Sequence, residues 1–93
     1  MASLSVANTV NATLTLLVVD SITCTRPFQW AVVINRSATE IYATADGTEP
    51  SVEGSGSFVV LAGERKDFTV ADSRDAVIKV IAAAAATYAV EFI

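Results

Sequence analysis

The chain has 93 residues, of which 53% are hydrophobic and 17% charged, and it carries a formal net charge of -4. This length supports one hydrophobic core, which excludes a second domain, and the apolar composition excludes a disordered chain. The scattered basic residues exclude a nucleic-acid-binding surface, because phosphates require clustered Lys and Arg. We therefore expect a single domain over residues 1–93. Because the mean hydropathy of +0.52 is high for so small a protein, we also expect partner subunits to cover part of its surface.

The N-terminal segment, residues 1–10, carries no charged side chain. We expect it to form an extended arm that can add to a neighbouring sheet. The segment lacks the basic residues of a secretory signal, and the apolar run over 14–19 is too short to cross a membrane. We therefore expect no membrane partner and synthesis in the cytoplasm. A chain from Met1 to Ile93 without a linker is expected to be a self-standing product.

The first half of the chain is rich in β-branched residues, and its apolar residues recur at a spacing of two, which predicts strands. A first strand is predicted over 13–20. A turn-rich segment follows over 21–27, since Pro27 cannot continue a central ladder. A second strand is predicted over 28–35. Its two faces are Phe28, Trp30, Val32 and Ile34 on one side and Gln29, Ala31, Val33 and Asn35 on the other. Both faces are largely apolar, which predicts a central position in a sheet.

The second half continues with short strands. A strand over 40–45 ends at Asp46-Gly47, a turn dipeptide whose residues tolerate positive φ. A solvated loop is predicted over 48–57. Further strands are predicted over 58–61, 67–70, 76–82 and 87–93, separated by a charged connection over 62–66 and a polar turn over 72–75. The final strand places Tyr88, Val90 and Phe92 on one face.

The alanine-rich segment also fits a helical stripe over 76–84, because alanine is the best helix former. The β-branched cluster over 77–81 and the alternation over 88–92 favour strands instead, joined by a tight connection over 82–86. The chain then contains six to eight short strands. This pattern predicts an all-β fold, a compact single-domain β-sandwich that is immunoglobulin-like or jelly-roll-like. The order of the strands stays open.

Candidate catalytic and metal-binding residues are few. The chain has no His, the commonest general base and metal ligand. Asp46, Glu49 and Glu53 share one loop, but their spacing matches no calcium-binding loop. The carboxylates are too numerous and too evenly spread over turns to select a catalytic pair. We therefore predict no catalytic residues, no cofactor-binding residues, no metal site, no cofactor and no enzymatic activity.

The remaining side chains of interest are one thiol and three aromatics. Cys24 has no partner for a disulfide within the chain, and we expect it to be a buried small side chain. Trp30 could contribute to a sugar-binding platform, but its apolar neighbours in a central strand favour core packing. Tyr42 and Tyr88 are expected to keep their hydroxyl groups at the rim of the core.

Five segments together form a recognisable pattern. They are 34–37 (INRS), 40–52 (EIYATADGTEPSV), 58–63 (FVVLAG), 77–81 (VIKVI) and 88–91 (YAVE). In this combination the chain resembles small virion proteins of tailed phages that infect actinobacteria. The piece IYATADGTEP alone also resembles immunoglobulin-like modules appended to chitobiase-type glycosidases. Ser51 stands where the virion proteins usually have Thr, and Leu61 where they often have Pro; neither difference bears on function.

The resemblance implies a β-sandwich that decorates and stabilises a capsid lattice from the capsid exterior. It implies that the partners are the assembled major capsid protein and the protein itself, as a homotrimer, and that synthesis takes place in the host bacterial cytoplasm. Two alternatives remain. A head-fibre or tail-associated adhesion module would bind host surface glycans and would need exposed aromatics on one face, and an accessory domain would belong to an enzyme.

The physical content of the motif over 41–50 is a turn. Ile41 and Ala43 are expected to point one way while Tyr42 and Thr44 point the other. The dipeptide Asp46-Gly47 then reverses the chain, and Pro50 fixes φ at the exit. The motif therefore predicts local structure and no chemistry.

Overall fold

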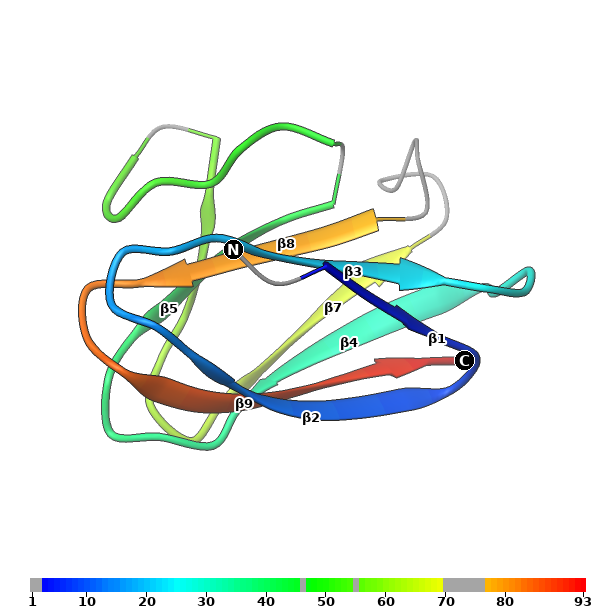
Figure 1. Cartoon of the computed structure of the whole chain (residues 1–93), viewed down its shortest axis with the longest axis horizontal. Coiled ribbons are helices and arrows are strands. Elements are labelled where there is room, and N and C mark those ends of the chain that lie inside the picture. The colour runs from blue at the N-terminus through cyan, green and yellow to red at the C-terminus, as the bar shows by residue number, and fades with distance from the viewer. Residues whose placement is uncertain (1–2, 46, 55, 70–76) are drawn as a thin grey trace.

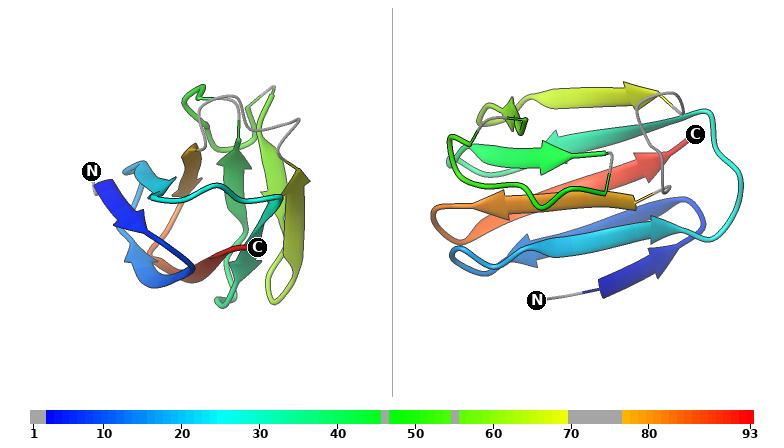
Figure 2. Two further views of the ribbon diagram at one scale, coloured as in Figure 1. Left: turned by 90° about the vertical axis from the view of Figure 1, so that its right-hand side faces the viewer. Right: turned by 90° about the horizontal axis from the view of Figure 1, so that it is seen from above.

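The computed structural model describes residues 3–45, 47–54, 56–69 and 77–93. Within these residues it contains nine strands and no helix. The strands form two sheets that pack face to face, with the connections at the two ends of the molecule (Figures 1 and 2). The predicted fold class, an all-β single-domain sandwich, is confirmed.

The first sheet contains five strands in the order β1-β3-β8-β5-β6. They are β1 (Ser3–Val6), β3 (Asp20–Cys24), β8 (Val77–Ala82), β5 (Ile41–Thr44) and β6 (Phe58–Val60). Strand β1 runs parallel to β3, whereas all other neighbours in this sheet are antiparallel.

The second sheet contains four antiparallel strands in the order β2-β9-β4-β7. They are β2 (Thr9–Leu14), β9 (Ala86–Phe92), β4 (Trp30–Asn35) and β7 (Arg65–Thr69). Strand β4 lies between β9 and β7, so the predicted central position of this segment is confirmed. The strand begins at Trp30, two residues later than predicted.

The core lies between the sheets and is built from alternate residues of each strand. The side chains that are fully inaccessible to solvent include Ile22, Ala31, Val33, Ile41, Ala43, Ile78, Val80, Ala82 and Val90. Most of them are small or β-branched, which suits the narrow space between two pleated surfaces. Burial of Cys24, with 8% of its surface exposed, agrees with the prediction of a small core residue.

A buried hydrogen bond connects the two sheets. The Tyr88 hydroxyl on β9 donates to an Asp20 carboxylate oxygen on β3 at 2.8 Å. Tyr88 is 1% exposed, so the expectation that its hydroxyl lies at the rim is wrong. Burial, followed by the hydrogen bond with Asp20 and the charge of Asp20, raises the pKa of Tyr88 well above its ordinary value.

The predicted first strand over 13–20 is wrong. Strand β2 ends at Leu14, and the chain crosses to the other sheet before β3 begins at Asp20. Leu17 sits in this turn with a φ of 55°, a conformation that leucine adopts rarely. The segment predicted as turn-rich, 21–27, in turn contains most of β3. No Gly, Pro, Asn or Asp marks the turn, so the apolar run concealed it.

The N-terminal residues are not a free arm. Ser3–Val6 pairs with β3, and Thr9–Leu14 pairs with β9. The side chains of Leu4, Val6 and Val10 pack against the core. These two strands explain why the structure contains nine strands where six to eight were expected.

The alanine-rich segment forms strands, and the helical alternative is wrong. Strands β8 and β9 are joined by a turn over 83–85 whose alanines are exposed. The predicted common face of Tyr88, Val90 and Phe92 is confirmed, since all three are buried in the core. The polar turn predicted over 72–75 lies outside the described residues.

Candidate interaction surfaces

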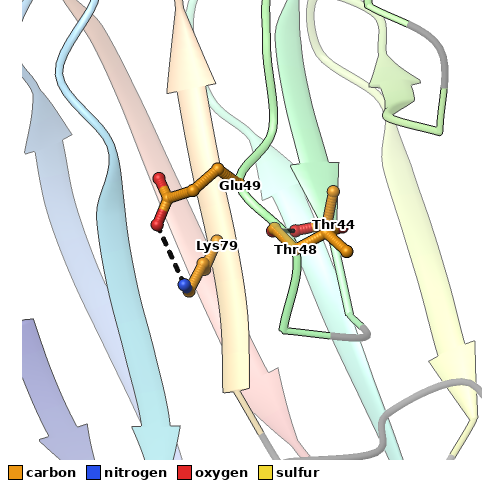
Figure 3. A network of polar contacts seen from close by, with 4 residues as sticks. All are labelled: Thr44, Thr48, Glu49 and Lys79. Atoms are coloured by element: carbon orange, nitrogen blue, oxygen red, sulfur yellow. Dashed lines mark hydrogen bonds and ion pairs between the residues drawn. The ribbon is translucent and has the colours of Figure 1, made fainter.

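The loop between β5 and β6 lies against the outer face of the first sheet (Figure 3). The Thr44 hydroxyl donates to the carbonyl oxygen of Thr48 at 2.6 Å. Lys79 Nζ on β8 donates to Glu49 Oε1 at 3.0 Å, which ties the loop to the neighbouring strand. Pro50 is buried within this loop. The segment predicted as solvated is therefore in part a cover for the sheet.

The strand before this loop has the alternation expected from the sequence. Ile41 and Ala43 are fully buried in the core. Tyr42 and Thr44 belong to the opposite face, where the loop leaves them 8% and 2% exposed. Burial, and then the charges of Glu40 and Glu53, raise the pKa of Tyr42 above its ordinary value. Gly47 has a φ of 85°, which confirms the positive φ predicted for this turn.

Among the described residues there is no group of three or more potential metal ligands. Of the three loop carboxylates considered, Glu49 is paired with Lys79 and Asp46 lies outside the described residues. The loop therefore gives no observation in favour of a cation site.

The INRS segment organises the turn between β4 and β5. Asn35 is 1% exposed, and its amide nitrogen donates to the carbonyl oxygens of Thr39 at 2.6 Å and Val60 at 2.9 Å. Its amide oxygen accepts from the backbone N–H and the hydroxyl of Ser37 at 3.0 and 2.8 Å. One buried side chain thus connects β4, the turn and β6, so this part of the motif is structural.

The outer face of the second sheet carries an exposed tryptophan. Ala31 and Val33 point into the core, so alternation places Trp30 on the opposite, solvent-facing side of β4. Trp30 is 38% exposed. The prediction that it packs in the core is wrong, because the pattern gave the two faces of the strand without indicating which one points inward.

Two carboxylates accompany Trp30 on this face. Val32, two residues along the strand, is paired with Asp67 of β7 on one side and with Glu91 of β9 on the other. Paired residues share a face of the sheet, so both carboxylates flank the stripe that continues from Trp30. Asp67 also forms an exposed ion pair with Arg65 at 3.4 Å. The face therefore combines an indole ring with hydrogen-bond acceptors.

A shallow hollow lies beside Trp30, at the end of the strand. It is lined by Arg26, Pro27, Phe28, Gln29 and Ile93. The backbones of Trp30 and Ile93 are hydrogen-bonded to each other, and the side chain of Ile93 is 44% exposed. Apolar surface thus extends from the outer face of the second sheet into this hollow.

Two apolar turns lie side by side at the end of the molecule on the left of Figure 1, where the turn over 36–40 also places the exposed Arg36 and Glu40. There the turn over 15–19 lies beside the turn over 83–85, and the N–H of Leu17 donates to the carbonyl of Ala82 at 3.0 Å. Leu16 and Leu17 are 55% and 60% exposed, and the three alanines next to them are exposed as well. We call Leu16, Leu17 and residues 83–85 the apolar end. No sequence signal predicted it, because it depends on a turn that the apolar run concealed.

Compared with known proteins, the chain matches no family model, no curated sequence and no solved structure. The part of the chain that the structure describes contains no helix long and apolar enough to cross a bilayer.

Proposed function

We propose that the protein is a non-enzymatic structural component of a phage virion. It decorates the capsid exterior and stabilises the lattice by binding the assembled major capsid protein, on which its copies are grouped as homotrimers. The observation that supports this proposal best is the apolar end, because two adjacent exposed leucines beside three exposed alanines are unfavourable in water and suited to a contact with a partner.

The free energy of this contact can be estimated from the side chains that it buries. Burying an exposed leucine contributes up to roughly 1 to 2 kcal/mol, so Leu16 and Leu17 together supply a few kcal/mol per copy. A lattice presents the same contact many times. A ligand that binds only the assembled shell stabilises that shell by mass action. Because the apolar end contains no charged residue, its binding should depend little on salt.

The test is co-sedimentation of the protein with expanded empty capsids at low and high salt. The double variant Leu16→Ser, Leu17→Ser is expected to weaken binding by at least about tenfold, as expected from the lost burial. The matched control is Val59→Ser, an apolar residue 46% exposed on β6, which should bind as the wild type does. Equal binding by the double variant would refute this docking surface, and failure of the wild type to sediment would refute the decoration role.

A second candidate function is favoured by Trp30. An adhesion module for host surface glycans needs an exposed aromatic ring with polar neighbours, and the outer face of the second sheet offers Trp30 beside Asp67 and Glu91. Aromatic rings stack on the apolar face of a sugar while carboxylates accept bonds from its hydroxyl groups. On a glycan array this function predicts binding that Trp30→Ala abolishes. An array without signal for the wild type would exclude it.

A further inference from the structure

Strand β2 forms an unprotected edge of the second sheet. No other strand of the described part of the chain lies on its far side. Strand β1, the edge of the first sheet, lies on the same side of the molecule (Figure 2). Exposed sheet edges in proteins are usually protected by charges, by Pro or by bulges, because unpaired N–H and C=O groups attract other strands.

The segment that forms both edges carries no charged residue of its own, and the charged side chains that reach it include Arg36, which donates to Asn11, and Arg26, which donates to Asn8. Residues 3–19 contain no Asp, Glu, Lys or Arg, although the chain carries sixteen of them, six basic and ten acidic. The opposite edge of the same sheet, β7, begins with Arg65, Lys66 and Asp67. Two copies with a net charge of -4 each repel one another, and an edge strand without acidic residues adds nothing to that repulsion at the contact.

The register shows which backbone groups of β2 face outward. The N–H of Phe92 donates to the carbonyl of Asn8 at 2.7 Å, so this position is a hydrogen-bonded pair of the antiparallel ladder between β2 and β9. Hydrogen-bonded and non-hydrogen-bonded pairs alternate along such a ladder. Thr9, Asn11 and Thr13 therefore occupy non-hydrogen-bonded positions and direct their N–H and C=O groups away from β9.

The order of these three outward-facing residues, Thr-Asn-Thr, is palindromic. A second β2 strand placed antiparallel, with a two-fold axis at Asn11, pairs Asn11 with Asn11 and Thr9 with Thr13. Every outward backbone group of the three residues then meets a partner. The Thr pairs are a favourable cross-strand combination. An interface around a two-fold axis must be self-complementary in this way.

We propose that β2 is a self-association edge that pairs with β2 of a second copy and joins the second sheets of the two copies into one continuous sheet. On the inner face, Val10 of one copy then lies directly opposite Ala12 of the other, so the two cores become continuous. The inference goes beyond the capsid proposal, because it concerns the protein alone in solution. On a particle, such a two-fold contact would connect copies that belong to two neighbouring homotrimers.

The first test is the mass of the protein in solution, measured by sedimentation equilibrium over a range of concentrations. The wild type should approach twice the chain mass of 9.7 kDa. Asn11→Lys places two ammonium groups at the axis, near the Arg36 side chains that donate to Asn11 at 3.1 Å, and should weaken the dimer at least about tenfold. The control Gln29→Lys, an exposed neutral residue outside the edge, should leave it unchanged.

A second test remains valid if Asn11→Lys proves unstable. In a Cys24→Ala background, Asn11→Cys should form a disulfide between two copies under mild oxidation, because residues at the axis have Cα atoms about 5.5 Å apart. Ala62→Cys, exposed on the turn before β7, reports random collisions and should stay monomeric. A monomeric wild type, an oligomer insensitive to Asn11→Lys in a folded variant, or equal cross-linking at both cysteines would each overturn the proposal.

Discussion

Replacing Asn35 by alanine should destabilise the fold strongly, although the change removes only a few atoms. The amide makes four hydrogen bonds, to Thr39, Val60 and twice to Ser37. The bond to the Val60 carbonyl is buried, and water cannot easily replace it. Removing the amide leaves its hydrogen-bond partners unsatisfied, at a total cost of about 2 to 4 kcal/mol in unfolding free energy. The buried bond to Val60 accounts for more of this cost than each of the part-buried bonds.

The measurement is urea denaturation followed by tryptophan fluorescence, with thermal unfolding as a second observable. For a domain of this size, a loss of about 3 kcal/mol lowers the melting temperature by about 12 to 24 °C. The total stability of such a domain is about 5 to 15 kcal/mol, so the variant would keep only part of it.

The matched control is another asparagine. Asn8 accepts two side-chain hydrogen bonds from Arg26, at 3.1 and 2.8 Å, but both are exposed. Water can replace them, so Asn8→Ala should cost no more than about 0.5 kcal/mol. If the two variants lose equal stability, burial does not determine the contribution of these amides, and the reasoning about Asn35 is wrong.

Two further substitutions and one chemical modification test other parts of the fold. Because the pKa of Tyr88 is raised from its ordinary value of 10.0, the stability it contributes is present below that pH and is lost as the pH rises above it. Tyr88→Phe should cost about 1 to 3 kcal/mol at neutral pH and flatten the fall in stability that begins near pH 10 and continues above it; an unchanged alkaline slope would contradict this. Gly47→Val should cost roughly 1 to 3 kcal/mol through strain at positive φ, and an unchanged denaturation midpoint would show that the turn relaxes. Cys24 should react with a thiol reagent at least about tenfold more slowly in the native protein than in urea, and equal rates would show that it is accessible.

The sequence predicted those elements whose alternation is bounded by turn residues. The strand over 41–44 and its glycine turn follow directly from the order of apolar and small residues. The β8–β9 hairpin could also be predicted, because the β-branched residues over 77–81 outweigh the helix propensity of the adjacent alanines.

The elements that could not be predicted are those that depend on tertiary contacts. The turn over 15–19 lacks any residue typical of turns. The sequence therefore predicts one strand over 13–20 and a turn over 21–27, where the structure has β2, a turn and β3. The inward face of β4 was equally undetermined, since both faces are apolar. In the structure Asn35 faces inward, because its amide finds hydrogen-bond partners there in the carbonyl groups of Thr39 and Val60. Trp30 belongs to the other face of the strand and therefore points outward.

The pairing of β2 with β9 has a consequence for biosynthesis. Thr9 is paired with Glu91, and in the other sheet Ser21 is paired with Lys79. Strands near the N-terminus therefore cannot pair until the strands near the C-terminus have been synthesised. Neither sheet can therefore close around its first strands until almost the whole domain has been synthesised. Sheets that depend on such distant pairings also form slowly once the chain is released. Newly made chains thus pass through a period in which the edges and the leucines of the N-terminal third are exposed and are best protected by chaperones.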